Sequence, residues 1–534
     1  MFQFMTDRNV MLTSHLSSNM LLAALALGIS VFAYGFEGGV VNTTQAMPKF
    51  IEMFGERNPA TGKSVLTPSQ LAYLNSIPLV TYAVGVVVAS QLSERFGRKM
   101  VFFLMNSICI SGVAISYTST SYGQILAGRM ILQTHIGMEA ALVPMYMAEI
   151  VPSAIRGRMV ASYTFSHICA NFISSIITNF TSKYPDHSSW RIPFGIIFTF
   201  PALALLLSIF LPESPRWLLR KGKPEEARAA LWYLNSAQKE FDADEHIKLQ
   251  RQALEDSVEK GKWSDLLKGT NKKRTITAIV AACSSMLTGM SFASNYGTVF
   301  LAQVNIMDPF TATMIKRAVL LLGPITVMTC IERLGRRKTF LSMGTLSATS
   351  LLMMGVLGAI QPATDGLKRG IVALSVLFPY AYIASFGSIM QIVPSEISHI
   401  SLRDKTSMVY WIVSDVANFA ATFSLPYLLS EPYAALGAKV AFIYAATSVC
   451  FLVWAYFCYH ELTGRSLEEV DELFAEGVPA WRSAKWVSTS KMGQLTALEN
   501  SKGDAGAAMR EKATDQDSES TRHVENGVGK KSQP

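Results

Sequence analysis

The sequence carries little charge for its length. Only 16% of its 534 residues are Asp, Glu, Lys or Arg, whereas soluble domains carry roughly 25%. Half of the residues are apolar, and they cluster in blocks of about 20, the length that a helix needs to cross a bilayer core. This composition excludes a soluble enzyme, a secreted disulfide-bonded scaffold and a wholly disordered protein. It indicates a polytopic membrane protein.

Cysteine is also scarce, and the motifs of nucleotide-driven or hydrolytic enzymes are missing. The six cysteines lie inside apolar blocks and none forms a CxxC pair, so neither a disulfide framework nor a zinc site is indicated. The chain has no P-loop, no HExxH and no GxSxG in a strand–turn–helix context. We expect no enzyme activity, no cofactor and no metal. Transport would then draw on a proton gradient or on the gradient of the solute itself.

The apolar blocks predict an all-α protein with twelve transmembrane helices. The first six spans are expected at 20–41, 68–92, 99–118, 124–148, 158–181 and 191–211. The last six are expected at 275–301, 310–331, 339–360, 370–394, 406–429 and 437–459. Residues 212–274 between them are polar and charged, and they predict a cytoplasmic helical linker with a helix that begins near Pro224.

These spans divide the chain into two six-helix halves, 20–211 and 275–460, with an N-terminal segment 1–19 and a tail 461–534. The composition of the tail predicts disorder beyond about residue 480. Lys and Arg concentrate in the loops that follow even-numbered spans, and the 3–4 and 7–8 loops have none. Because cytoplasmic loops carry this excess, we expect the linker and both termini to face the cytoplasm. The net charge of +8 therefore reports topology, and no nucleic-acid partner is expected.

A short charged motif recurs at the same place in both halves. After span 2 it reads Glu94-Arg95-Phe96-Gly97-Arg98-Lys99, and after span 8 it reads Glu332-Arg333-Leu334-Gly335-Arg336-Arg337-Lys338. Repeated halves with a solute site between them are typical of secondary transporters. The repeat therefore predicts two pseudo-symmetric halves.

Further motifs run nearly end to end along the chain. They are Gly128-Arg129, Pro144-x-Tyr146-x-Ala148-Glu149, Arg156-Gly157, Pro212-Glu213-Ser214-Pro215-Arg216-Trp217, Pro394-Ser395-Glu396 and Glu461-Leu462-Thr463-Gly464-Arg465. With these motifs the chain resembles the sugar porter branch of the major facilitator superfamily, and its fungal sugar/H⁺ symporters in particular. The last motif departs from the family's usual Pro-Glu-Thr-x-Gly. The resemblance implies a monomeric, multi-pass carrier of a small polar solute in the plasma membrane.

A carboxylate and a guanidinium are expected at equal depth in two spans. Glu37 and Arg129 both lie roughly 6–8 Å below the outer surface, given 1.5 Å per helical residue. Ionisable groups inside a bilayer are costly and mark function, so we expect the two to pair. In proton-coupled sugar porters the matching acid, usually Asp, and the matching Arg couple proton uptake to transport. Here Glu replaces Asp. The alternative is a static ion pair that fixes helix packing.

Span 4 carries a second polar pair. His135 and Glu139 are four residues apart and therefore share a helix face. Porters of this family usually have small residues where this chain has Gln133 and His135. The face lies about 120° from Arg129 in a regular helix, and we expect it to make a separate polar contact with a neighbouring helix.

Polar side chains at helical spacing in the spans are candidates for solute binding. The large ones, His167, Asn171, Gln391, Asp415 and Asn418, are the stronger candidates because they need partners or water, whereas a single Ser or Thr more often packs helices together. The candidate set is Thr164, His167, Asn171, Ser285, Thr288, Ser291, Asn295, Tyr296, Ser388, Gln391, Asp415 and Asn418. Sugar porters typically carry several amide side chains and a Trp at matching positions, and amides both donate to and accept from hydroxyls. This chain has lost several of those amides, so its cavity does not specify a hexose.

Three functions remain open. The first is proton-coupled transport of a sugar, glycoside, polyol or similar solute. The second is a carrier of the same fold for another small organic molecule, such as a secondary metabolite or an organic acid. The third is a nutrient sensor that does not transport and signals through its tail.

Charged residues at the cytoplasmic ends are expected to act as gates. They are Glu94, Arg95, Arg98, Glu149, Arg156, Glu213 and Arg216 in the first half and linker, and Arg333, Arg336, Glu396, Arg403 and Glu461 in the second half. In this family such charges form ion-pair networks that hold the outward-open state and break as the halves rock. We expect the two sets to face each other across the halves.

Overall fold

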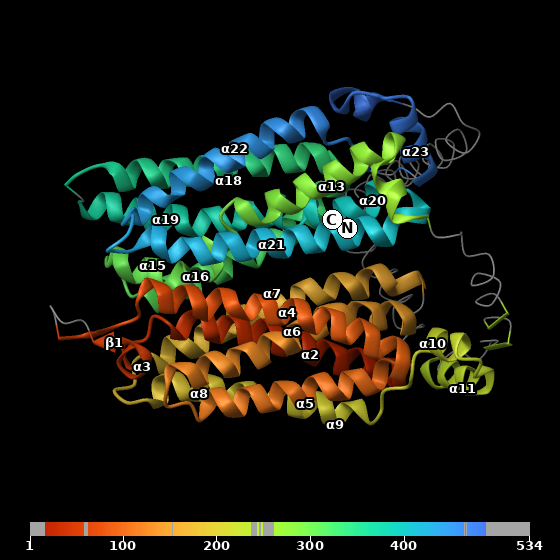
Figure 1. Ribbon diagram of the computed structural model, residues 1–534, viewed down its shortest axis with the longest axis horizontal. Coiled ribbons are helices and arrows are strands. Elements are labelled where there is room, and N and C mark those ends of the chain that lie inside the picture. Colours follow the sequence, from red (N-terminus) through yellow and green to blue (C-terminus); the bar gives the residue numbers. More distant parts are fainter. Residues whose placement is uncertain are drawn as a thin grey trace, which may run out of the picture.

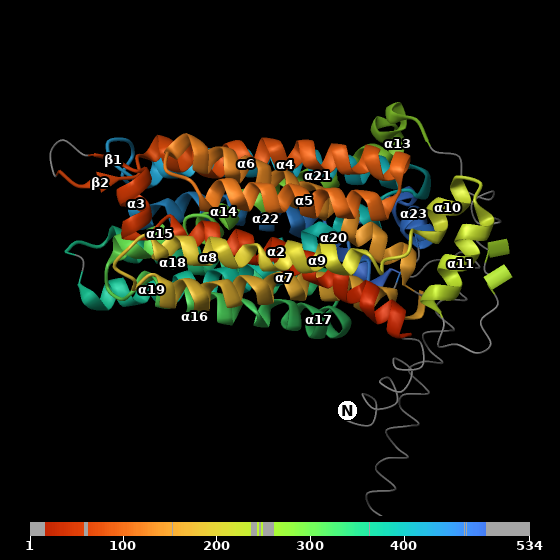
Figure 2. The same ribbon diagram turned by 90° about the horizontal axis from the view of Figure 1, so that it is seen from below.

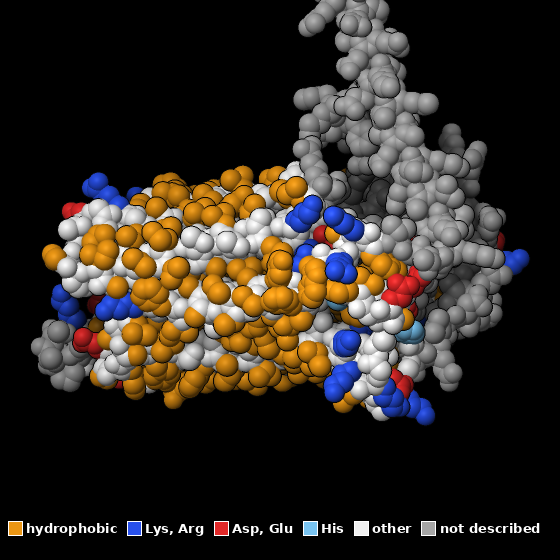
Figure 3. Space-filling view, turned by 90° about the horizontal axis from the view of Figure 1, so that it is seen from above, with side chains coloured by type: hydrophobic (Ala, Val, Ile, Leu, Met, Phe, Trp, Pro, Cys, Tyr) orange, Lys and Arg blue, Asp and Glu red, His pale blue; other side chains and the backbone are white. Residues whose placement is uncertain are grey.

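The computed structural model describes residues 17–57, 62–151, 153–235, 243–244, 247–248, 261–362, 364–463, 465 and 467–486. Long helices run along one axis in two bundles that lie side by side (Figure 1). Hydrophobic side chains cover the flank of the molecule, and Lys, Arg, Asp and Glu gather toward its two ends (Figure 3). This is the distribution expected of a helical bundle that crosses a bilayer.

The first bundle is built from the first half of the chain. Its elements are α2 (Ser18–Thr44), α4 (Pro68–Phe96), α5 (Arg98–Tyr117), α6 (Tyr122–Ile150), α7 (Ser153–Thr181), α8 (Ser188–Ile197) and α9 (Thr199–Ser208). Side chains fix where several of them begin. Thr67 and Gln70 form a capping box at the start of α4, and Ser121 accepts a hydrogen bond from the Gln124 N–H at the start of α6.

The second bundle is built from the second half. Its elements are α13 (Gly269–Leu287), α14 (Met290–Ser294), α15 (Gly297–Val304), α16 (Pro309–Leu320), α17 (Leu322–Leu334), α18 (Arg336–Ala359), α19 (Asp365–Tyr382), the π-helical turn η2 (Ile383–Gly387), α20 (Ile389–Ile397), α21 (Arg403–Leu429), η4 (Gly437–Lys439) and α22 (Val440–Cys458). Across the described residues, ten helical segments are long and apolar enough to cross a membrane. With α6 and α7, of 29 residues each, they account for the twelve predicted spans.

Smaller elements mark the two ends of the molecule. At one end lie α3 (Pro48–Phe54) and a hairpin of β1 (Glu56–Arg57) and β2 (Ser64–Val65), paired antiparallel. At the other end lie α10 (Pro215–Arg220), α11 (Pro224–Leu234), η1 (Trp263–Leu267), α23 (Leu467–Ala475) and η5 (Ala480–Lys485). Figures 1 and 2 show these groups at opposite ends of the long axis, which we name the hairpin end and the linker end.

Among the boundaries that differ from those expected from the sequence, two lie at the linker end. The seventh span begins at Gly269, not at residue 275, and Arg274 in its second turn pairs with Asp471. The described chain also continues to residue 486, where Trp486 Nε1 donates to Glu476 Oε2 at 2.7 Å. The tail beyond residue 486 and most of residues 236–260 lie outside the described residues. Tertiary contacts, which local composition does not report, explain both differences.

The linker is attached to both bundles. Near its start, Trp217 Nε1 donates to the Glu94 carbonyl at 2.9 Å, and Asn19 of the first bundle donates to the Tyr233 carbonyl at 3.1 Å. Near its end, the Gly261 N–H donates to the Ser401 carbonyl at 3.2 Å in the second bundle. The two described ends of the linker are therefore anchored to different halves.

Two spans of the second bundle are interrupted near their middle. Span 7 breaks at Gly289, whose φ of 100° is in the left-handed region, and again at Tyr296 between α14 and α15. Span 10 contains the π-helical turn η2. Irregular backbone at membrane depth is tolerated where protein buries it or where it lines a water-filled cavity. Interrupted helices of this kind form solute sites in transporters.

Glycine allows α4 and α6 to approach closely. A Cβ atom on Gly137 would lie 2.1 Å from the Tyr82 carbonyl oxygen, and one on Gly85 would lie 2.2 Å from the Thr134 carbonyl oxygen. Because the obstructing atoms are backbone, the neighbouring helix has to move if a methyl group is added.

We therefore expect Gly137→Ala to destabilise the first half by about 1–3 kcal/mol, seen as a lower midpoint of thermal unfolding of the detergent-purified protein. Gly28→Ala is the matched control, because it is also helical and has no atom within 4 Å of an added Cβ. Equal midpoints for the two variants would contradict this packing.

Candidate functional site

The repeated motif forms the same clamp in both halves at the linker end. Arg98 donates to the two carboxylate oxygens of Glu149 at 2.8 and 2.9 Å, while Glu213 accepts from the Arg98 N–H at 2.7 Å. In the second half, Arg336 pairs with Glu396 at 2.8 Å, and Glu461 accepts from the Arg336 N–H at 3.0 Å. A carboxylate thus caps the first N–H groups of α5 and of α18, where helix-dipole and hydrogen-bond effects favour an anion.

The clamp explains the glycine of the motif. Gly97 and Gly335 have φ angles of 95° and 85°, which disfavour any residue with a side chain. A Cβ atom at these positions would also lie 2.3 Å from Glu213 Oε2 and 2.6 Å from Glu461 Oε2. Partial burial raises the pKa of Glu213, although the N–H groups that it accepts from oppose this shift.

The predicted gating network is arranged differently from the expectation. Among the described residues, the ion pairs of Arg98 and Arg336 stay within their own half instead of crossing to the other. Arg95 lies over the ring of Phe96 at 5.3 Å, and Arg403 is exposed at the start of α21. Glu94 contributes its carbonyl to Trp217, Arg216 lies on α10, and the side chains of Arg156 and Arg333 lie outside the described residues.

Hydrogen bonds between the halves occur from mid-depth toward the hairpin end. Asn179 accepts from Thr311 at 3.2 Å, Asn42 donates to Asn295 at 3.5 Å, and the Tyr296 hydroxyl donates to the Leu71 carbonyl at 3.2 Å. The inter-half hydrogen bonds of the described residues thus gather between mid-depth and the hairpin end, and the ion pairs of the two motifs stay within their own halves.

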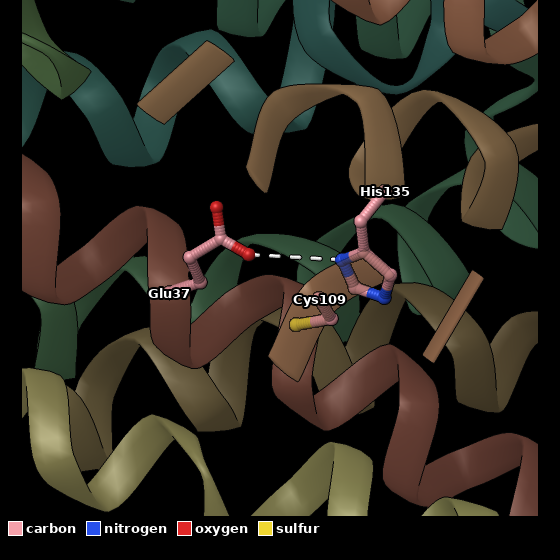
Figure 4. Close-up of side chains that lie close together, drawn as sticks. All are labelled: Glu37, Cys109 and His135. Carbon is pink, nitrogen blue, oxygen red and sulfur yellow. Dashed lines mark ion pairs between the residues drawn. The ribbon is translucent and has the colours of Figure 1, made fainter. Parts of the chain in front are cut away.

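Glu37 lies in a buried polar cluster with His135 and Cys109. His135 Nδ1 is 3.7 Å from Glu37 Oε2, and the exposed fractions of the two side chains are 0% and 3% (Figure 4). Glu37 Oε2 and both ring nitrogens of His135 have no hydrogen-bond partner. Helices α2, α5 and α6 thus bring together an acid, an imidazole and a thiol in an apolar surrounding.

The expected ion pair between Glu37 and Arg129 is not a direct contact. Arg129 Nη1 donates instead to Asn75 Oδ1 at 3.0 Å, and Asn75 also exchanges hydrogen bonds of 2.9 Å with Gln45. This amide pair takes up the guanidinium, while His135 is the basic group within 4 Å of Glu37. The helix phase suggested a contact of His135 and Glu139 that is separate from Glu37, but His135 faces Glu37 directly. Glu139 does contact a neighbouring helix, α7, because it accepts a hydrogen bond from Tyr163 at 2.8 Å.

The ligand atoms of Glu37, Cys109 and His135 lie within 4.8 Å of one another. Three ligands fall short of the four protein ligands of a structural zinc site, and we describe the trio as a polar cluster.

The candidate solute residues fall into two groups and a remainder. In the first half, the Tyr34 ring packs 4.2 Å from the His167 ring, and Asn171 lies 3.4 Å from His167 Nε2. In the second half, Ser291 donates to Asn418 at 3.1 Å, and the Tyr296 hydroxyl also lies 3.1 Å from the Thr422 carbonyl. Both groups lie at the interface between the halves.

The remaining candidates are placed less centrally or are already bonded. Thr288 is buried and donates to the Ser284 carbonyl at 2.7 Å, and Ser285 accepts from Tyr410 at 3.5 Å. Thr164 and Gln391 are exposed, and Ser388 is half-buried at the break in span 10. Asp415 is half-buried and lies within electrostatic range of Tyr34 across the interface.

Sequence reasoning missed two buried cations. Lys316 and Arg317 are adjacent in α16 and each is 7% exposed. Arg317 Nη1 donates to the Asn171 carbonyl at 3.0 Å, so it joins the second half to the first. The signal was present, since charged residues inside an apolar block mark function.

Comparisons with known proteins agree with this architecture. The family model for the sugar (and other) transporter matches residues 22–474. The major facilitator-type transporter ecdD of Aspergillus rugulosus is 28% identical over 470 residues, which cover 85% of this chain and 87% of that protein. The high glucose sensor RGT2 of Saccharomyces cerevisiae is 26% identical over 484 residues, which cover 88% of this chain and 63% of the sensor.

A solved structure shows the same fold. The inward-open conformation of the xylose transporter XylE from E. coli superimposes with a TM-score of 0.71 at 19% identity, covering 85% of this chain and 99% of that one. Another structure of XylE describes it as a proton:xylose symporter. Since the family model matches most of its length, the chain belongs to the sugar transporter family of the major facilitator superfamily, whose members are membrane transporters and not enzymes.

Proposed function

We propose that this protein is a proton-coupled secondary transporter that moves a small polyhydroxylated solute by alternating access. The observation that carries the proposal is Glu37, a carboxyl group that is 3% exposed within the membrane and lies 3.7 Å from an imidazole. An ionisable group buried at membrane depth is retained for function. The proton:xylose symporter XylE shares the fold, which supports this assignment.

The two halves supply the proposed solute site. His167 and Asn171 contribute from the first half, and Ser291, Tyr296 and Asn418 contribute from the second. With the linker end assigned to the cytoplasm from the excess of Lys and Arg, closure at the hairpin end makes this an inward-facing state. A monomer holds both halves of the pathway, and we place it in the plasma membrane with both termini inside.

His135 is part of the proposed coupling site. The titratable and charged groups around Glu37 are His135 and Arg129 from α6, Cys109 from α5 and Tyr34 from α2 itself. A neutral imidazole has one nitrogen that donates and one that accepts, so His135 can exchange a proton with the carboxyl group that it faces at 3.7 Å. A proton shared by Glu37 and His135 would be released when the cluster gains contact with water.

A second candidate function is transport of a non-sugar organic molecule by the same mechanism. It is favoured by Thr164, Ser285 and Ser291, which stand at positions where sugar porters usually carry amide side chains. The similarity to a glucose sensor covers only 63% of that protein, and a sensor does not need a buried proton site, so we rank sensing third.

Replacing Glu37 should uncouple transport. Uptake of labelled hexoses, disaccharides, polyols and quinate would be measured in a transporter-deficient host, with and without a protonophore. We expect one solute to accumulate in a protonophore-sensitive way, and Glu37→Gln to abolish that accumulation while equilibration persists. Glu52→Gln, an exposed acid on α3, is the control. Protonophore-sensitive accumulation by Glu37→Gln would contradict the assignment of Glu37 to proton coupling. If no solute of the panel is taken up, the second candidate function is favoured.

Replacing His135 should change the pH dependence of transport. We expect His135→Gln to flatten the dependence of uptake on external pH, because the base that faces Glu37 is removed. Cys109→Ala is the control, since it alters the same cluster without removing a base. A pH profile of His135→Gln that superimposes on the wild type would assign His135 to packing alone.

Neutralising the clamps should slow transport without preventing insertion. Arg98→Gln removes the partner of a buried carboxylate, Glu149 at 7% exposure, and Arg336→Gln removes that of the wetter Glu396 at 21%. We expect the larger loss for Arg98→Gln, because breaking a buried pair costs about 3–5 kcal/mol. Uptake would be normalised to surface protein, with exposed Lys338→Gln as the control. Unchanged uptake in both clamp variants would argue against a role in the cycle.

A further inference from the structure

Two adjacent cations in α16 have no acidic partner in the part of the chain that the structure describes. Lys316 and Arg317 are each 7% exposed and lie about 10 Å along the helix from its start at Pro309. Among the described residues, no carboxylate lies within 4 Å of either one, whereas the buried cations Arg98 and Arg274 each have an acid in contact. Charges at membrane depth are normally paired, or they line a solute pathway.

Three hydrogen bonds tie Arg317 to acceptors in the first half. Its Nη1 donates to the Asn171 carbonyl at 3.0 Å and to Ser174 Oγ at 3.1 Å, and its Nη2 donates to the Gly39 carbonyl at 3.3 Å. These acceptors are neutral, so they satisfy hydrogen bonds without cancelling the charge. Arg317 therefore leaves a positive field beside Asn171, at the interface between the halves.

The donors of Lys316 are only partly used. Its Nζ donates to the Ala293 carbonyl at 2.8 Å, at the end of α14, and an ammonium group has three N–H donors. The break in span 7 makes room for it, because a Cβ atom on Gly297 would lie 2.2 Å from Lys316 Nζ. The ammonium group thus sits against the backbone that carries Asn295 and Tyr296, two of the candidate solute residues.

We propose that the solute is an anion, a small polyhydroxylated carboxylate such as a sugar acid, and that Lys316 binds its carboxylate group. This proposal rests on the proposed transport function and specifies its solute. The hydroxyl groups of such a solute suit Asn171, Ser291 and Tyr296, while its carboxylate balances one of the two cations that have no acid in contact. A monocarboxylate and one proton would cross the membrane together as a neutral pair.

A helix-capping role is the competing explanation, because cations near a helix C-terminus are stabilising and Ala293 lies near the end of α14. Capping requires only the bond to Ala293. It predicts a change in the stability of the free protein and no preference between an acid and its neutral analogue.

The test uses two matched pairs of probes, D-galacturonate with D-galactose and D-gluconate with D-glucose. The thermal midpoint of the purified full-length protein would be titrated with each probe, because a ligand of the native state raises it. We expect an acid to stabilise the wild type at concentrations about tenfold below its neutral partner. Lys316→Gln and Gly297→Ala should lose that preference, and Lys439→Gln, an exposed lysine at the same end, should keep it.

Several results would overturn the anion site. They are equal or better stabilisation by the neutral sugars, no stabilisation by either acid, and an acid preference that survives Lys316→Gln. A lower midpoint of unliganded Lys316→Gln with the preference intact would assign Lys316 to capping. Arg317→Lys should retain acid binding because it retains the charge.

Uptake of the same labelled probes separates this proposal from the transport function. Wild-type protein that concentrates galactose but not galacturonate overturns the anion site and leaves the transporter intact. Protein that binds galacturonate through Lys316 but takes up no probe supports the anion site and rejects the transport function.

Discussion

Charge inside a bilayer has to be balanced close by, and this constraint organises the whole molecule. At the linker end each half balances its own charges in a clamp of a guanidinium, two carboxylates and the N–H groups at a helix start. Within the first bundle, Arg129 is held by an amide pair and Glu37 by an imidazole. In α16, two cations are left with neutral acceptors only. The clamps, in which each charge has an opposite charge in contact, stabilise the fold. The sites where a buried charge lacks such a partner are the proposed proton and solute sites.

The clamps give each half a stable internal frame. Glu213 and Glu461 connect the end of the sixth helix of each half to the start of the third, and Arg98 and Arg336 add a connection to the fourth helix of each half. Because these bonds do not cross between halves, they do not have to break when the halves move as rigid bodies. The contacts that do cross, such as those of Asn179, are mostly neutral hydrogen bonds, which exchange with water at small net cost.

Much of the fold could be predicted from the sequence, because hydropathy, the excess of basic residues in alternate loops and the repeated motif are local signals. The contacts within the site were harder to predict from the sequence. Arg129 and His135 lie six residues apart on one helix, and only the positions of α2 and α4 decide that His135 meets Glu37 while Asn75 takes Arg129. The gate pairing depends on which end of the molecule is closed, which no sequence pattern records. Lys316 and Arg317 were visible as charges in an apolar block, but their missing partners become evident only in three dimensions.

The attachment of the linker to both halves has a mechanical consequence. Trp217 and Tyr233 hold one end of it to the first bundle, and Gly261 holds the other end to the second. Any rocking of the bundles would therefore change the distance between these anchors at the linker end. A pair of spectroscopic labels on α11 and η1 would register each turnover from outside the membrane, without a probe in the solute path.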